Sequence, residues 1–209
     1  MKTTLRAMLS LAAIAAAFAL PAPAEEGAKG DLYTLDVCPV SGEKLGSMGD
    51  PIVMSVDGRE VRFCCDGCPK KYKAGPSKYV PKIDKMMTDA QASLYPTDTC
   101  VVSGKPLDAK AVSMVVGNRL MKFCCADCPK KAAADPATYI AKLDEAAIAK
   151  QSEKYPLKTC AVSGDKLGEH GDVIKLVVGG RLIELCCADC KKEIAKDPAK
   201  VLSKVSAGK

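Results

Sequence analysis

The cysteines of this 209-residue chain fall into three copies of one pattern, and none of the twelve lies outside it. Each copy begins with Cys-x-Val-Ser-Gly and continues, 24 to 26 residues after that first cysteine, with Cys-Cys-x-x-Cys. Four thiols grouped in this way three times predict three small metal sites, with about one ion each, rather than one active site. The copies are Cys38, Cys64, Cys65 and Cys68; Cys100, Cys124, Cys125 and Cys128; and Cys160, Cys186, Cys187 and Cys190.

The repeat extends beyond the cysteines. A tyrosine stands five residues before the first cysteine of every copy, as Tyr33, Tyr95 and Tyr155. Units of about 60 residues are near the lower limit for burying a core of their own. Aromatic residues make up only 4% of the chain and Trp is absent, so we expect small α+β units stabilised by metal and joined by modest contacts. The expected units span residues 31–88, 89–149 and 150–209.

The N-terminus predicts export. Lys2 and Arg6 precede an apolar run over residues 7–20, and Ala22-Pro23-Ala24 offers a cleavage site. We therefore expect a cleaved signal peptide over residues 1–24 and a spacer over 25–30, because the apolar run is too short to span a bilayer comfortably. The mature chain is then periplasmic or extracellular, without a membrane span.

The charge pattern argues against nucleic acid as a partner. The formal net charge is +6, and removal of Lys2 and Arg6 with the signal leaves +4. Lysines and acidic residues are interspersed, whereas a nucleic-acid surface needs a basic stripe with stacking aromatic residues.

Each unit reads as a turn, a hairpin and then helices. In the first unit, Gly42 allows the positive φ of a tight turn after Cys38, and Asp57-Gly58 predicts a two-residue hairpin turn between strands at 52–56 and 60–63. A helix is expected to open at the double cysteine and to be followed by a second helix. The second helices are expected at 76–87, 136–150 and 198–206, with Asp135 and Asp197 as N-caps.

This order places three sulfurs near a helix N-terminus, with the fourth supplied by the turn. Unpaired N–H groups and the helix dipole favour the thiolate, which is the form that binds metal. Adjacent side chains such as Cys64 and Cys65 normally diverge, so the sequence leaves open which of them is the third ligand beside Cys38 and Cys68, or whether both bind.

Other residues receive structural interpretations. The tyrosines before the turns are expected to pack at unit boundaries, and Met54, Met114 and Met121 are expected in the core. His170, the single histidine, has no counterpart in the other copies and is read as a loop residue. No His–carboxylate pair, phosphate loop or serine with a catalytic partner is recognisable, so we expect no enzyme activity.

The motif resembles the TRASH and YHS group of small treble-clef domains. The matching residues are Cys38, Phe63, Cys64, Cys68 and Tyr79; Cys100, Phe123, Cys124, Cys128, Asp135-Pro136 and Tyr139; and Cys160, Cys186, Cys190 and Asp197-Pro198. The resemblance covers nearly the whole mature chain and implies three tandem treble-clef-like units that bind soft metal, with roles in metal sensing, trafficking or resistance. This chain departs from that pattern at Cys65, Cys125 and Cys187, where serine is frequent in the family, and at Leu185 and Val201, which replace aromatic residues.

We therefore expect an exported protein that binds zinc or copper(I) for buffering, trafficking or resistance, with a metal-transfer protein as a possible partner. Four thiolates suit zinc, and three suit copper(I). One alternative is a scaffold in which zinc is structural and a protein partner binds. Another is a thiol–disulfide redox protein, since each Cys-x-x-Cys lies at a predicted helix start. Disulfides within each unit are a further possibility in an exported chain.

Overall fold

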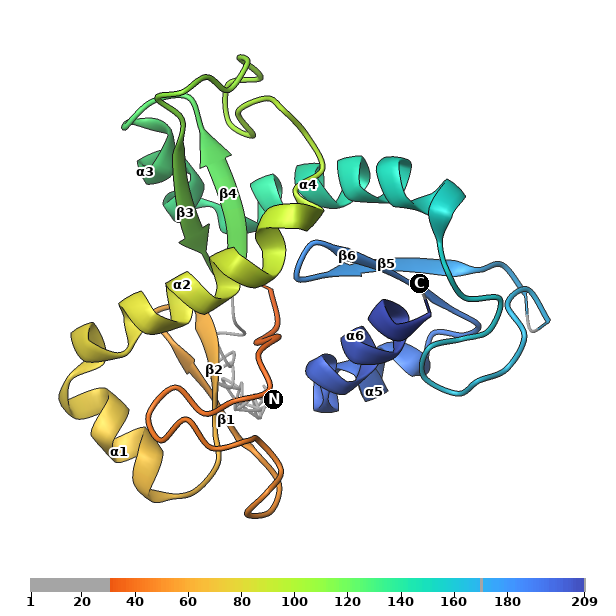
Figure 1. The fold of residues 1–209 in the computed structure, drawn as a ribbon, viewed down its shortest axis with the longest axis horizontal. Helices are drawn as coiled ribbons and strands as arrows, with labels where there is room; N and C mark the ends of the chain where they lie inside the picture. Colours follow the sequence, from red (N-terminus) through yellow and green to blue (C-terminus); the bar gives the residue numbers. More distant parts are fainter. Residues whose placement is uncertain (1–30, 170, 209) are drawn as a thin grey trace, which may run out of the picture.

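The computed structural model describes residues 31–169 and 171–208. The expected signal peptide and spacer, and His170, lie outside the described residues. Three small α+β units follow one another along the chain, each with a two-stranded antiparallel sheet and helices (Figure 1).

The three units contain the same elements in the same order. In each unit, a hairpin is followed by a short helix and then by a second helix. The elements are β1 (Ile52–Val56), β2 (Arg59–Phe63), α1 (Gly67–Ala74) and α2 (Val80–Gln91); β3 (Val112–Val116), β4 (Arg119–Phe123), α3 (Cys128–Ala134) and α4 (Pro136–Gln151); and β5 (Ile174–Val178), β6 (Arg181–Leu185), α5 (Cys190–Lys196) and α6 (Pro198–Ala207).

The hairpins form where the sequence predicts them. Ile52 pairs with Phe63 and Val56 with Arg59, so two residues remain for the turn. Both turn residues have positive φ, 52° at Asp57 and 74° at Gly58, as a type I′ turn requires. The same conformation recurs at Gly117-Asn118 and Gly179-Gly180.

The helices confirm two predicted caps and correct one predicted start. The carboxylates of Asp135 and Asp197 accept hydrogen bonds from the backbone N–H groups of Thr138 and Lys200. In the first unit the expected helix over 76–87 is wrong at its start, because only a 3₁₀ turn forms over Pro76–Lys78 before α2 begins at Val80. Pro81 lacks the N–H that a continuous helix needs there. At their other ends α2 and α4 continue to Gln91 and Gln151, past the expected unit boundaries at 88 and 149.

Each unit packs a small core of its own. In the first, the fully buried side chains of Phe63, Tyr72 and Ile83 pack around the cysteines. The prediction that Met114 is a core residue is wrong, since 43% of its surface is exposed, whereas its cross-strand neighbour Met121 is fully buried. None of the helices in the described residues is both long and apolar enough to cross a membrane.

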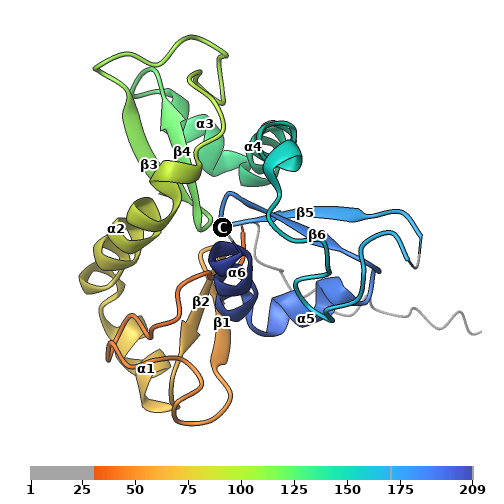
Figure 2. The same cartoon turned by 45° about the vertical axis from the view of Figure 1, so that its right-hand side comes forward.

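The three hairpins radiate from the middle of the molecule, with their turns at the centre and their cysteine ends outward (Figures 1 and 2). The helices α2 and α4 each end in a glutamine whose side chain binds the backbone of the next hairpin. The Gln91 side chain donates to the carbonyl of Asn118 and accepts from the N–H of Leu120, both at 2.8 Å. Gln151 repeats this with Gly180 and Leu182 at 2.8 and 3.0 Å.

Polar groups at the centre connect all three units. The Asn118 side chain accepts from Arg59 Nε at 2.6 Å and donates to the Glu60 carbonyl at 2.8 Å. The Asp31 carboxylate accepts from the N–H of Gly179 at 2.8 Å and lies 3.2 Å from Arg119 Nε. Buried charges need such partners to offset desolvation.

The third unit also contacts the first. The Arg62 guanidinium, 3% exposed, donates to the carbonyls of Ala195 and Lys196 at the C-terminal end of α5. A cation at this end is favoured by the helix dipole and satisfies carbonyls that the helix leaves free. The expectation of modest contacts between units is therefore wrong.

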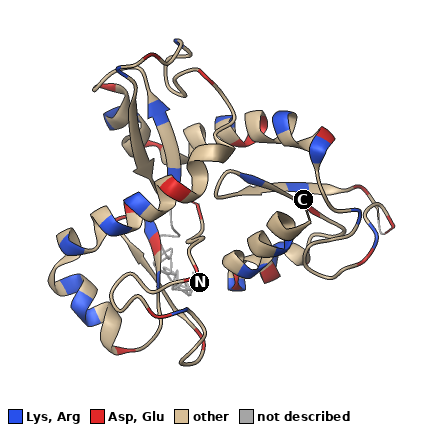
Figure 3. Cartoon of the chain, in the orientation of Figure 1, with Lys and Arg blue, Asp and Glu red and all other residues tan. Residues whose placement is uncertain are grey.

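Lys and Arg lie on helices of all three units with acidic residues among them, as predicted (Figure 3).

Candidate metal centres

The first cysteine of each unit lies in a closed backbone turn. The Gly42 N–H donates to the Cys38 carbonyl, and the Cys38 N–H donates to the Glu43 carbonyl, both at 2.8 Å. Gly42 has a φ of 80°, which confirms its predicted role. Gly104 and Gly164 close the same turn onto Cys100 and Cys160.

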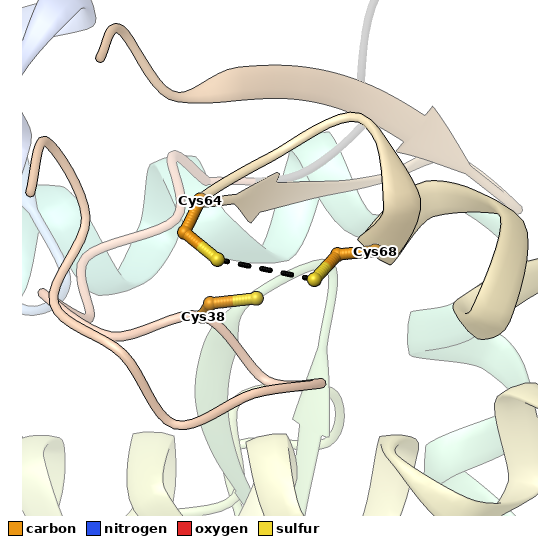
Figure 4. Close-up of side chains that lie close together, drawn as sticks. All are labelled: Cys38, Cys64 and Cys68. Atoms are coloured by element: carbon orange, nitrogen blue, oxygen red, sulfur yellow. Dashed lines mark hydrogen bonds between the residues drawn. The ribbon is translucent and has the colours of Figure 1, made fainter. Parts of the chain in front are cut away.

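The bend between the hairpin and the short helix supplies two more sulfurs. Cys64 directly follows β2, and Cys68 lies in the first turn of α1. The predicted helix start at the double cysteine is too early, because Cys64 and Cys65 occupy the bend before the helix begins. This bend turns the Cys64 side chain toward Cys38 and Cys68 (Figure 4).

Each unit therefore holds a group of three cysteines, which we call a trio, whose sulfur atoms all lie within 4.8 Å of one another. The turn cysteine and the helix cysteine of every trio are buried, whereas Cys124 is half-buried. The trios are Cys38, Cys64 and Cys68; Cys100, Cys124 and Cys128; and Cys160, Cys186 and Cys190.

The trio spacing fits a thiolate-bound ion. A zinc–sulfur bond of about 2.3 Å in tetrahedral geometry separates the sulfurs by about 3.8 Å. Three of the separations match this value, at 3.8 Å for Cys64–Cys68, 3.9 Å for Cys186–Cys190 and 3.7 Å for Cys160–Cys190, and the others are within 4.8 Å. The donor atoms are thus preorganised for an ion that prefers sulfur.

The fourth cysteine of each unit lies beside the trio. Cys65 Sγ is 3.5 Å from Cys68 Sγ, and the corresponding distances are 3.4 Å for Cys125–Cys128 and 3.3 Å for Cys187–Cys190. Cys125 is exposed, and Cys65 and Cys187 are partly exposed. Cys64 and its equivalents are therefore the cysteines that complete the trios, and Cys65 and its equivalents lie beside them.

The environment of the turn cysteines favours the thiolate. Burial raises the pKa of Cys38, but hydrogen bonds from the Ser41 side chain and from the N–H groups of Ser41 and Cys64 outweigh it and bring the pKa to about 7. The same balance lowers the pKa of Cys100 and Cys160 to about 6. One sulfur of each trio is therefore readily ionised near neutral pH.

The helix cysteines behave in the opposite way. Burial first, and then the neighbouring thiols, raise the pKa of Cys68 and of Cys128 to about 12. The pKa of Cys190 is raised for the same reasons. For these helix cysteines, the expectation that the helix N-terminus favours the thiolate is wrong. The pKa of the exposed Cys125 is lowered, mainly by a hydrogen bond from Cys128 and then by backbone N–H groups at the start of the helix.

The serine of the Cys-x-Val-Ser-Gly turn contacts both the backbone and a trio sulfur. The Ser41 hydroxyl accepts from the Glu43 N–H at 3.2 Å and also lies 3.2 Å from Cys64 Sγ. Ser103 and Ser163 lie 3.2 and 3.4 Å from Cys124 and Cys186. The recurrence of serine at this position in all three copies is the signal that could have identified the contact.

The second unit has the most accessible site. Its extra cysteine, Cys125, is exposed. Cys124 is half-buried, whereas the equivalent residues of the other two units, Cys64 and Cys186, are both 2% exposed. Lys105 follows its turn glycine, whereas Asp165 occupies this position in the third unit, with its carboxylate 3.9 Å from Cys186 Sγ.

No family model, curated protein or solved structure gives a significant match to this chain.

Proposed function

We propose that the protein is a carrier of soft metal ions that holds one ion in each cysteine trio. The observation that supports this most strongly is the recurrence of three sulfurs within 4.8 Å of one another in all three units. Soft thiolate ligands select zinc and copper(I) over hard cations. No group in this proposal performs catalysis.

Zinc is the principal ion in this proposal and copper(I) the second. A trio supplies three of the four ligands that structural zinc takes, and rotation of the Cys65 side chain supplies the fourth from 3.5 Å away. For copper(I), the three sulfur ligands of the trio are sufficient. The partly exposed fourth thiol then serves as the ligand through which an ion passes to a transfer partner.

The wider setting belongs to the same proposal. The resemblance to TRASH and YHS domains supports a role among treble-clef metal proteins of trafficking and resistance. The signal-like N-terminus supports a location in the periplasm or outside the cell. Buffering or handing over zinc or copper(I) outside the cytoplasm is the role that unites these features.

A carrier is favoured over a scaffold with structural zinc by how the units are joined. The contacts between units are made by Gln91, Asn118, Arg62 and their partners, and none of them involves a cysteine sulfur. An ion can therefore leave without releasing the units from one another. A scaffold held by its zinc would unfold when a chelator removes the metal.

The test is native mass spectrometry of the reduced protein titrated with zinc and, separately, with copper(I). Three ions per chain are expected, falling to two in Cys68→Ser, with Ser47→Ala as a control because Ser47 is an exposed hydroxyl outside the trio. Circular dichroism after addition of a moderate chelator separates the roles. A carrier loses its ions and keeps its secondary structure, and failure to bind any ion would refute the proposal.

A further inference from the structure

One sulfur in each unit has two sets of neighbours. Cys68 Sγ lies 3.8 Å from Cys64 Sγ within the trio and 3.5 Å from Cys65 Sγ outside it. In the third unit Cys190 has the same position, 3.9 Å from Cys186 and 3.3 Å from Cys187. The helix cysteine is thus shared between a candidate metal centre and a Cys-x-x-Cys pair.

In the first unit, the backbone between the paired cysteines is compatible with a disulfide. The Cys68 N–H donates to the Cys65 carbonyl at 3.1 Å, which closes a four-residue turn. Such a turn brings its first and last Cα atoms within about 7 Å, and disulfides join Cα atoms about 4.4 to 6.8 Å apart. Side-chain rotation is then sufficient to form the bond.

Exposure decides which thiol an outside reagent meets first. Cys125 is exposed, whereas Cys100 and Cys128 are 1% and 6% exposed. In the other units Cys65 and Cys187 are more exposed than the trio sulfurs beside them. The cysteine outside the trio is therefore the accessible member of each pair, and the second unit is the most open.

We propose that the Cys-x-x-Cys pairs are thiol–disulfide modification sites, and that forming the disulfide removes the helix cysteine from its trio and releases the metal ion. The pairs are Cys65–Cys68, Cys125–Cys128 and Cys187–Cys190. This inference rests on the proposed function. Metal loading and the disulfide exclude each other because both need the same sulfur.

The oxidant is a low-molecular-weight or protein disulfide, and the reaction is thiol–disulfide exchange. The Cys125 thiolate attacks one sulfur of the oxidant, whose S–S bond breaks, and a mixed disulfide forms as the first thiolate leaves. The Cys128 thiolate then attacks the Cys125 sulfur, and the second thiolate leaves. The two cysteines lose two electrons in total, the oxidant is reduced to two thiols that take up protons from water, and the ion keeps only two sulfur ligands.

The experiment uses the full zinc-loaded chain with oxidised glutathione as the probe. Zinc per chain is counted by native mass spectrometry before and during oxidation, and the disulfides are located by peptide mapping without reduction. One zinc ion is expected to leave for every two thiols lost. The Cys125–Cys128 bond is expected to appear first.

Two variants make the result specific. Cys125→Ser is expected to slow zinc loss from the second unit at least tenfold, and Cys65→Ser is expected to leave loss from the second unit unchanged. Zinc loss from Cys125→Ser at the unaltered rate, or a first disulfide that joins Cys100 or Cys124 to Cys128, would overturn the inference. If the chain takes up no zinc before the oxidant is added, the proposed function itself is refuted. Zinc uptake is measured before the oxidation begins, so this result is distinguished from a failure of the present inference.

Discussion

The side-chain amide of Asn118 lies 2.8 Å from the backbone carbonyl of Glu60, so the tip of the second hairpin is attached to a strand of the first. Asn118 is fully buried and also accepts from Arg59 Nε at 2.6 Å. Its φ of 67° is a conformation that asparagine tolerates better than most residues. One side chain thus supports both the turn and the contact between units.

Replacing Asn118 with glycine should destabilise the protein by about 3 kcal/mol, because a partly buried guanidinium N–H and a partly buried carbonyl lose their partners. Glycine keeps the positive φ, as Gly180 does in the third unit, so the change reports on the side chain alone. Urea unfolding of the metal-free reduced protein measures the difference. The exposed Ser113→Ala on the same hairpin is the control and should change stability by less than about 0.5 kcal/mol. An equally small effect of Asn118→Gly would show that the contact contributes little.

The two adjacent cysteines of the first unit should differ in their effect on metal binding. Cys64→Ser removes a trio sulfur and should abolish binding at that unit, whereas Cys65→Ser should leave an ion bound. Competition with a chromophoric zinc chelator gives the affinity, and native mass spectrometry gives the count. Loss of the ion in both variants would show that Cys65 is an obligatory ligand.

Metal affinity should rise with pH. Burial raises the pKa of Cys68 to about 12, and the pKa of Cys64 is also raised, with burial acting against a hydrogen bond from Ser41. Both protons must leave when the ion binds, so apparent affinity should increase about a hundredfold per pH unit between pH 7 and 8, and more steeply below pH 7, where Cys38 also takes up a proton. Isothermal titration calorimetry in buffers of different ionisation enthalpy counts the protons released. Release of fewer than one proton per ion would contradict this.

Alkylation of the reduced, metal-free protein should follow exposure and ionisation. Cys125 is exposed and its pKa is lowered by a hydrogen bond from Cys128 and by nearby backbone N–H groups, so it should react first with iodoacetamide at pH 7. Cys128, buried and with its pKa raised to about 12, should be among the last. Peptide mass mapping over time gives the order, and early labelling of Cys128 would count against the described arrangement.

Local structure could be predicted from sequence where a residue type has one dominant physical role. Asp57-Gly58 predicted the hairpin turn because both positions need positive φ, and Asp135 and Asp197 predicted helix caps because their carboxylates satisfy free N–H groups. The cysteine spacing likewise predicted three groups of cysteines, but not which of Cys64 and Cys65 belongs to the trio of the first unit. That choice depends on the direction of the bend between strand and helix, which spacing does not encode.

The contacts between units were missed because their residues look ordinary. A glutamine four residues before a boundary tyrosine occurs at Gln91 and again at Gln151, and this recurrence was the available signal. Nothing in the sequence marked Arg62 as a contact between units, because its partners are backbone carbonyls 133 and 134 residues away. Long-range pairing of a side chain with backbone leaves no pattern in one sequence.

The contact between Arg62 and the end of α5 determines how many units the arrangement accommodates. Repeat proteins that stack in a line grow by adding copies to an open end. Here the first and third units meet, so the sequence of units closes on itself as a ring of three. Inserting a fourth copy between them would separate Arg62 from these two carbonyls and leave Glu60 as its remaining partner. Copy number is thus constrained by the contacts of Arg62 and Asp31 with the third unit, and evolution by duplication would have to replace those contacts first.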